Sequence, residues 1–241
     1  MNTAVIFAGG SGVRMNSKSK PKQFLELNGK PIIIHTLQYF QNNSEIDSIA
    51  VVCIDGWIDY LKDILQKNFI TKVKWIVPGG TTGQVSIYNG LRAIYDDIDN
   101  PNDTIVLIHD GVRPLISEKL ISDNIACAKK YGTAITVVPL METIVSINDS
   151  NNITTINNRS LSRIARAPQT FVLSDIMSAH IRAIEDKNLN FIDSASLMLH
   201  YGYSLKTVDG PIENIKITTP ADFYIFRAIY EARENSQIFG I

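Results

Sequence analysis

The chain has 241 residues, is 45% hydrophobic and carries a formal net charge of −1. This length fits one α/β domain with a sizeable core, and the charge gives no sign of the dense basic surface that nucleic-acid binding needs. The two cysteines, Cys53 and Cys127, predict buried thiols in a reducing compartment rather than disulfides or a metal cluster. Because Gly-Gly-Ser-Gly interrupts the apolar N-terminal run and no segment approaches roughly 20 apolar residues, we expect a cytoplasmic protein without membrane insertion.

The first part of the chain alternates between expected strands and expected helices. Apolar runs predict buried strands, and the first helix begins at Pro31, a residue suited to a helix start. The expected strands are residues 3–8, 48–54, 73–77, 104–109 and 133–138, and the expected helices are 31–41, 57–67, 85–95 and 117–130. This alternation predicts an α/β fold in one domain over residues 1–241: a Rossmann-like, mostly parallel sheet with helices on both faces.

Residues 142–157 interrupt this alternation. Two β-branched stretches, 143–147 and 153–156, flank Asn-Asp-Ser-Asn-Asn, and this pattern predicts a β-hairpin. A lone hairpin is barely stable in water, so we expect it to pack against something, for which a second subunit is a reasonable candidate. The rest of the chain predicts helices at 174–186 and 193–201, a strand at 203–208 and a closing helix at 220–235.

A glycine-rich segment, Ala8-Gly9-Gly10-Ser11-Gly12-Val13-Arg14-Met15, follows the first expected strand. Its glycines let backbone N–H groups approach phosphate oxygens. Arg14 and the later Lys22 add the positive charge that nucleotidyl transfer needs, because negative charge spreads over phosphate oxygens in the transition state. The alternatives are a simple turn with two solvated cations or a dinucleotide-binding loop. The third glycine and the acidic partner of such a loop are missing, and the lack of Gly-Lys-Ser/Thr excludes a Walker-type loop.

A second segment, His109-Asp110-Gly111-Val112-Arg113-Pro114, follows the expected strand 104–109. Ligands of such sheets bind at the carboxyl ends of the strands, and a carboxylate there suits Mg²⁺, which prefers oxygen ligands and stays partly hydrated. The alternative is that Asp110 caps the helix expected near Ser117. Arg113 could bind phosphate or orient Asp110.

Two further segments are less specific. Gly79-Gly80-Thr81-Thr82-Gly83-Gln84-Val85-Ser86 could read a pyrimidine edge through backbone and hydroxyl groups, or could simply lead into a helix. Lys216 stands in an apolar, strand-like run before the last expected helix. It could act on a phosphate or remain a solvated lysine.

Together these segments resemble the cytidylyltransferases of the methylerythritol phosphate and ribitol phosphate type, within the nucleotidyltransferases that have a Rossmann-like sheet. The resemblance covers essentially the whole chain, and its specificity comes from six motifs in family order. They are Ala8-Gly9-Gly10 with Arg14-Met15, Pro21-Lys22-Gln23-Phe24, Gly79-Gly80 with Ser86, His109-Asp110-Gly111-Val112-Arg113-Pro114, Ala167-Pro168-Gln169-Thr170-Phe171 and Asn214-Ile215-Lys216-Ile217-Thr218.

The resemblance implies a role for each matched position. The implied catalytic residues are Arg14, Lys22, Lys216 and Arg159, and Asp110 would hold Mg²⁺. Acceptor binding is implied for Thr143, Arg159, Arg113 and Lys216. Contacts to CTP are implied for Asp110 and for Phe7, Ala8, Gly9, Gly10, Ser11, Gly12, Gly80, Thr81 and Ser86. In the family the hairpin arm crosses to a partner subunit, so the resemblance implies a homodimer in which Thr143 and Arg159 serve the neighbour's site.

The sequence also departs from the family pattern. Gly83-Gln84 stand where many relatives carry an Arg, and Glu213 stands where the methylerythritol enzymes tend to carry Asp. Arg163 and Arg166 are additional candidates for the acceptor phosphate. The segments Asp110-Gly-Val-Arg and Lys216-Ile-Thr-Thr-Pro resemble the polyol phosphate branch more closely. The expected acceptor is therefore D-ribitol 5-phosphate, with methylerythritol phosphate as the alternative.

The expected reaction is direct in-line attack of the acceptor phosphate on the CTP α-phosphorus, with release of pyrophosphate. A phosphate monoester is mostly dianionic at pH 7, since its second pKa is about 6, and it needs no general base. His35, His180 and His200 fall in expected helices and are interpreted as structural, and His109 as a residue that packs or orients Asp110. A nicotinamide-dependent oxidoreductase and a catalytically silent nucleotide-binding protein are the alternatives from other classes.

Overall fold

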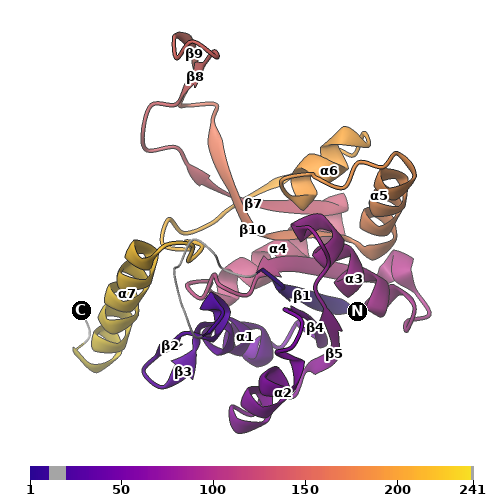
Figure 1. Ribbon diagram of the computed structural model, residues 1–241, viewed down its shortest axis with the longest axis vertical. Coiled ribbons are helices and arrows are strands. Elements are labelled where there is room, and N and C mark those ends of the chain that lie inside the picture. Colours follow the sequence, from indigo (N-terminus) through magenta and orange to yellow (C-terminus); the bar gives the residue numbers. More distant parts are fainter. Residues whose placement is uncertain (11–19, 240–241) are drawn as a thin grey trace.

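The computed structural model describes residues 1–10 and 20–239, with side chains up to residue 235, and is built around a seven-stranded sheet (Figure 1). The strand order is β11-β7-β10-β6-β1-β4-β5. Parallel pairing joins β1 to β4 and to β6, β4 to β5, and β7 to β11. These strands are β1 (Asn2–Ala8), β4 (Ser48–Cys53), β5 (Val73–Pro78), β6 (Ile105–Asp110), β7 (Thr133–Pro139), β10 (Arg163–Val172) and β11 (Thr207–Asp209). The predicted α/β fold with a mostly parallel sheet is confirmed.

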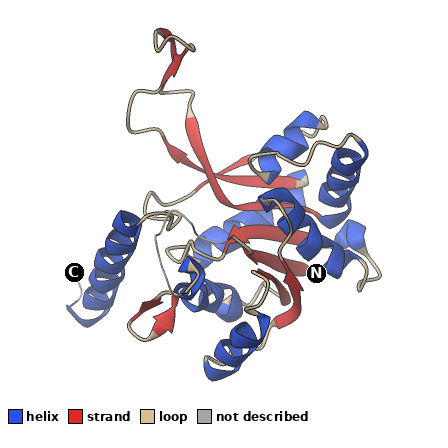
Figure 2. Cartoon of the chain, in the orientation of Figure 1, coloured by secondary structure: helices blue, strands red, loops and turns tan. Residues whose placement is uncertain are grey.

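Helices cover both faces of the sheet (Figure 2). A separate apolar core lies under each set. On one face, α1 (Ile32–Asn42), α2 (Ile58–Lys67) and α4 (Glu118–Tyr131) pack through residues such as Leu37, Leu61 and Ile121. On the other face, α3 (Gly83–Tyr95), α5 (Leu173–Glu185) and α6 (Ser194–His200) pack through Leu91 and Ile176. The strands between them are apolar on both sides because both faces are covered.

A third, smaller core joins the last helix to the start of the chain. α7 (Pro220–Phe239) contributes Phe226, which is fully buried against Leu27 of β2 (Glu26–Leu27) and Ile217. β2 pairs with β3 (Lys30–Pro31) in a small antiparallel sheet next to α7 (Figure 1). This packing carries the segment before α7, which contains Lys216, back to the carboxyl ends of β1 and β6.

The largest difference from the sequence-based expectation is β10, a strand that was not predicted. It lies in the middle of the sheet, antiparallel to both β6 and β7. Its sequence, Arg-Ile-Ala-Arg-Ala-Pro-Gln-Thr-Phe-Val, contains a proline and two arginines, which argue against a central strand. The proline is accommodated because the pairing with β7 shifts register between Ala165 and Gln169. The Ala167–Pro168 peptide bond is cis. Only the second half of the strand is buried.

Smaller differences concern element boundaries. The strand expected at 203–208 is the shorter β11, and the run around Lys216 forms no strand. α3 begins at Gly83, two residues before the expected start near Val85, and Asp110 ends β6 instead of following it. Cys53 is buried as expected, whereas Cys127 is partly exposed; both are free thiols. Within the described residues, no helix is long and apolar enough to cross a membrane.

The expected hairpin consists of β8 (Val145–Ile147) and β9 (Ile153–Ile156), which pair antiparallel. It projects from the body of the molecule beyond the end of β10 (Figure 1). Each strand residue is exposed, including Ile147, Ile153 and Ile156 at 57%, 61% and 65%. We call residues 141–162 the arm.

Candidate active site

The candidate site lies at the carboxyl ends of β1 and β6. The chain runs outward from β1 through β4 to β5 and then returns to β6 on the other side of β1, and ligands of open α/β sheets bind at such a switch point. Phe7 and Asp110 are paired across β1 and β6 at this edge. Two cavities adjoin there, with volumes of ≈ 660 and ≈ 250 Å³, and both are lined by Phe7, Gly83, Asp110 and Lys216.

Asp110 is the central charge of the site. Its Oδ2 accepts hydrogen bonds from Nε of Arg113 and lies 3.1 Å from Nη2 of the same guanidinium. Its Oδ1 forms an ion pair with Lys216 Nζ at 2.5 Å. Burial alone would raise the pKa of Asp110, but the charges of Arg113 and Lys216 lower it to about 2. Asp110 is therefore an ionised carboxylate at neutral pH, held between two cations.

Hydrogen bonds around Asp110 and Arg113 distinguish between the alternative roles that the sequence left open for these two residues. Helix α4 is capped by Ser117, whose hydroxyl accepts a hydrogen bond from the N–H of Leu120, so a capping role for Asp110 is wrong. Arg113 is 8% exposed and bridges Asp110 to the backbone oxygen of Asn214. It thus orients Asp110, and its binding to an acceptor stays a prediction.

Lys216 is fixed from several sides. Asn214 donates a hydrogen bond to the oxygen of Ala167 at 2.8 Å, and the N–H of Ile217 donates to Val112 at 2.9 Å. Beyond it, the Asp222 carboxylate accepts hydrogen bonds from the backbone N–H groups and hydroxyls of Thr218 and Thr219. The Lys216 ammonium also lies 5.5 Å from the centre of the Phe7 ring, within range of a cation–π contact. Lys216 is a positioned cation and not a freely solvated one.

The larger cavity has a floor of glycines. A Cβ on Gly9 would lie 3.1 Å from Cα of Gly79 and 3.3 Å from Oγ of Ser86, so glycine allows the two loops to approach this closely without a shift of either neighbour. The Ser86 hydroxyl accepts a hydrogen bond from the N–H of Gly80 and donates one to the oxygen of Thr82. Thr82 in turn caps α3 by accepting from the N–H of Val85. The result is a backbone-lined hollow beside a helix N-terminus, which suits an anionic ligand.

Lys22 enters the larger cavity from a 3₁₀ helix, Lys22–Phe24, and its ammonium donates a hydrogen bond to the backbone oxygen of Ile217 at 3.0 Å. The next residue, Gln23, is buried and donates to the oxygens of Ala8 and Gly10. Lys22, Gly9, Gly10 and Lys216 therefore line one cavity. The predicted positions Ser11, Gly12 and Arg14 lie outside the described residues.

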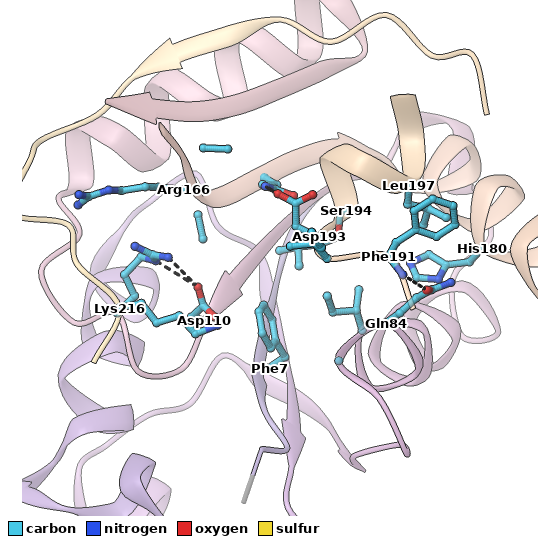
Figure 3. A pocket seen from close by; sticks show the side chains of 18 residues that line it. Phe7, Gln84, Asp110, Arg166, His180, Phe191, Asp193, Ser194, Leu197 and Lys216 are labelled. Atoms are coloured by element: carbon cyan, nitrogen blue, oxygen red, sulfur yellow. Dashed lines mark hydrogen bonds and ion pairs between the residues drawn. The ribbon is translucent and has the colours of Figure 1, made fainter. Parts of the chain in front are cut away.

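The smaller cavity contains Gln169 and Asp193, which the sequence analysis did not assign to a site, and Gln84 from the candidate segment 79–86 (Figure 3). Gln169 of β10 donates a hydrogen bond to the Asp193 carboxylate at 2.8 Å, and Gln84 of α3 accepts from the N–H of Phe191. His180 was interpreted as structural, yet it lines this cavity, and its Nε2 is buried without a hydrogen-bond partner in the described part of the chain. Burial lowers the pKa of His180 to about 4, so its ring is neutral at pH 7.

The predicted acceptor residues of the arm do not line either cavity of their own chain. Thr143 and Arg159 are exposed, and the Arg159 guanidinium donates to the backbone oxygen of Met141 within the arm. The other predicted positions, Phe7, Ala8, Gly80, Thr81, Ser86, Asp110 and Arg113, all line one or both cavities.

Comparison with known proteins identifies the family. The family model described as 2-C-methyl-D-erythritol 4-phosphate cytidylyltransferase matches residues 2–232. A ribitol-5-phosphate cytidylyltransferase from Vibrio parahaemolyticus is 52% identical over 240 residues, covering 100% of both chains.

Two more distant similarities agree with this match. A 2-C-methyl-D-erythritol 4-phosphate cytidylyltransferase from Syntrophus aciditrophicus is 37% identical and covers 96% of this chain and 97% of its own. The crystal structure of the 4-diphosphocytidyl-2C-methyl-D-erythritol synthase from Anaerococcus prevotii has a TM-score of 0.82 at 30% identity, with coverage of 95% and 96%. The chain belongs to this family of cytidylyltransferases and is a CTP-dependent nucleotidyltransferase.

Proposed function

We propose that this chain transfers CMP from CTP to D-ribitol 5-phosphate, giving CDP-ribitol and pyrophosphate. The observation that carries the choice of acceptor is the 52% identity over full length with a ribitol-5-phosphate cytidylyltransferase, against 37% with a methylerythritol phosphate enzyme. Methylerythritol phosphate is the second candidate, since the matching family model is described by that activity.

The two cavities suggest a separate binding place for each substrate. The larger one, with its glycine floor and Lys22, suits the nucleotide and its phosphates. The smaller one, with the hydrogen-bonding groups of Gln169, Asp193 and Gln84, suits a polyol. The reacting phosphates would meet at the shared wall, where Lys216 and Asp110 lie.

In the proposed reaction an oxygen of the acceptor phosphate forms a bond to the α-phosphorus of CTP, and the bond from that phosphorus to the pyrophosphate oxygen breaks. No proton has to be removed from the attacking dianion. The cationic groups of Lys22, Lys216 and Arg14 would stabilise the negative charge on the phosphate oxygens, which is the main means of catalysis open to such a site.

Mg²⁺ is proposed as the cofactor. Among the described residues no cluster of three or more His, Cys, Asp or Glu could hold a metal by itself. A site with a single carboxylate nevertheless fits Mg²⁺, which keeps several waters and binds through one or two carboxylates plus substrate phosphates. The buried, ionised Asp110 would be that carboxylate, and the ion would neutralise charge on the nucleotide. Asp110 lines both cavities, which supports this role.

We further propose a homodimer through the arm. Its exposed apolar residues, Ile147, Ile153 and Ile156, suit a surface covered by another protein chain. Thr143 and Arg159 would then act on the acceptor in the site of the partner. The free thiols of Cys53 and Cys127 are consistent with a reducing compartment such as the cytoplasm.

Pyrophosphate release tests the proposal. Purified protein with Mg²⁺ and CTP should release pyrophosphate with ribitol 5-phosphate, and much less with glycerol phosphate or methylerythritol phosphate. Replacing CTP with ATP, GTP or UTP is the nucleotide control. Preference for methylerythritol phosphate would establish the second candidate, and release that requires no acceptor would contradict both.

A further inference from the structure

We infer that Arg166, contributed by the same chain as the nucleotide site, binds the phosphate of the acceptor at the edge of the smaller cavity. This inference rests on the proposed function and names one more residue for it. Arg166 belongs to β10, the strand that the sequence did not predict, and it lines the smaller cavity with Asp110, Arg113 and Lys216. Figure 3 places it on the same side of the cavity as Lys216 and Asp110, across from His180 and Phe191.

The hydrogen bonding of Arg166 leaves it able to take an anion. Its Nη1 donates to the backbone oxygen of Ile212 at 2.7 Å, and in the described part of the chain no carboxylate lies within 4.0 Å of its guanidinium. A guanidinium has five N–H donors in a fork that matches phosphate oxygens. Arg166 therefore differs from Arg113, whose guanidinium already donates hydrogen bonds to the Asp110 carboxylate and to the backbone oxygen of Asn214.

The electrostatic surroundings favour an anionic ligand. Arg166 is half-buried, and burial together with the nearby Arg113 charge lowers its pKa, while Glu213 opposes that shift. Around Asp110 the two cations Arg113 and Lys216 already exceed the single negative charge. A partly desolvated excess of positive charge is costly unless an anion compensates it. A dianionic phosphate next to Lys216 would supply that compensation.

The other arginines of this stretch are used differently. Arg163, on the same strand, is exposed and donates to the backbone oxygens of Ser160 and Ser162 at the base of the arm. Arg159 contacts Met141 within the arm. Of the three arginines between residues 159 and 166, Arg166 is the one that lines a cavity of its own chain.

The test compares Arg166→Ala and Arg166→Lys with Arg92→Ala as the control, because Arg92 is exposed on α3, pairs with Asp96 and lines neither cavity. Initial rates are measured against ribitol 5-phosphate at saturating CTP, and against CTP at saturating acceptor. Losing a charge-assisted hydrogen bond should raise the acceptor KM of Arg166→Ala roughly 10–100-fold. The KM for CTP should stay within about twofold, as should both constants of Arg92→Ala. Arg166→Lys should recover part of the acceptor affinity, because it restores the charge but not the fork.

A binding measurement separates this role from a structural one. Calorimetry with ribitol 5-phosphate, in the presence of α,β-methylene-CTP, reports acceptor affinity without turnover. An unchanged affinity and KM in Arg166→Ala would overturn the inference. So would a parallel loss of CTP and acceptor affinity, because that pattern would mean that Arg166 only holds the loop at Ile212. If wild-type protein turns over no ribitol 5-phosphate, the proposed function fails first and the inference fails with it.

Discussion

Phe7 and Asp110 are neighbours across β1 and β6, and the Lys216 ammonium contacts both, the ring at 5.5 Å and the carboxylate at 2.5 Å. Three segments that are far apart in sequence thus converge on one point at the carboxyl edge of the sheet. Together with Gly83, the same three residues line both cavities. A ligand in either cavity can therefore contact Lys216 and Asp110.

Asp110→Asn should destabilise the fold as well as inactivate the enzyme. The Arg113 side chain, 10% exposed, would lose its carboxylate partner while remaining buried. Breaking one side of a buried ion pair costs on the order of 3 kcal/mol, and urea denaturation measures that loss. Asp123→Asn is the matched control, because Asp123 pairs with Lys119 on the exposed surface of α4 and its loss should cost at most about 1 kcal/mol.

The loss of stability in Asp110→Asn should also depend on pH. Burial would raise the pKa of Asp110, yet its two cations lower it to about 2, below the ordinary 3.8. A lowered folded-state pKa means that this stabilisation is complete above about pH 4 and is lost as the pH falls toward 2. The difference in unfolding free energy between wild type and Asp110→Asn should therefore shrink between pH 4 and pH 2. A constant difference across that range would contradict the ion-pair account.

Lys22→Ala should lose turnover while keeping the fold. Its ammonium lies over the larger cavity and contacts the backbone of Ile217, beside Lys216. Removing a preorganised cation or donor from such a site typically lowers kcat roughly 10²–10³-fold. Steady-state pyrophosphate release measures the loss, and circular dichroism checks the fold. Lys119→Ala, an exposed lysine of α4, should keep wild-type kcat. Near-normal turnover in Lys22→Ala would remove Lys22 from the catalytic residues.

The sequence predicted that the glycine-rich loops and Asp110 would meet at one edge of the sheet, and the structure brings them together there. Gly9, Gly79 and Asp110 each end or follow an apolar strand, and parallel topology brings such ends to one edge. The acceptor side was less predictable. β10 supplies Gln169 and Arg166, but Pro168 and the two arginines in its sequence are not typical of a central strand. Its pairing with β6 and β7 cannot be inferred from the sequence and is seen only in the structure. Asp193 gives only a helix-cap signal, since it caps α6.

The arm leads to a prediction about assembly. Ile147→Asp with Ile156→Asp places two charges on exposed apolar positions of β8 and β9. If a second copy covers these side chains, burying the charges is too costly and the protein should become monomeric by light scattering after gel filtration. Thr155→Asp, on the same strand opposite Ser146, is the control for added charge. A wild-type protein that is already monomeric would refute the dimer and leave Thr143 and Arg159 without a site.

The last prediction concerns the close approach of Gly9 and Gly79 in the larger cavity. Gly9→Ala would place a methyl group 3.1 Å from the Cα of Gly79 and 3.3 Å from the Oγ of Ser86, so these neighbours would have to move by a few tenths of an ångström. Overpacking of this kind typically costs about 1–3 kcal/mol, and the displaced Gly9 and Gly79 backbone should also weaken CTP binding. Gly83→Ala is a control for stability alone, because its methyl would meet no atom within 4 Å at the start of α3. Its unfolding free energy should be unchanged or higher by about 0.4–1 kcal/mol. Equal stability in Gly9→Ala and wild type would show that the two loops do not need their close approach.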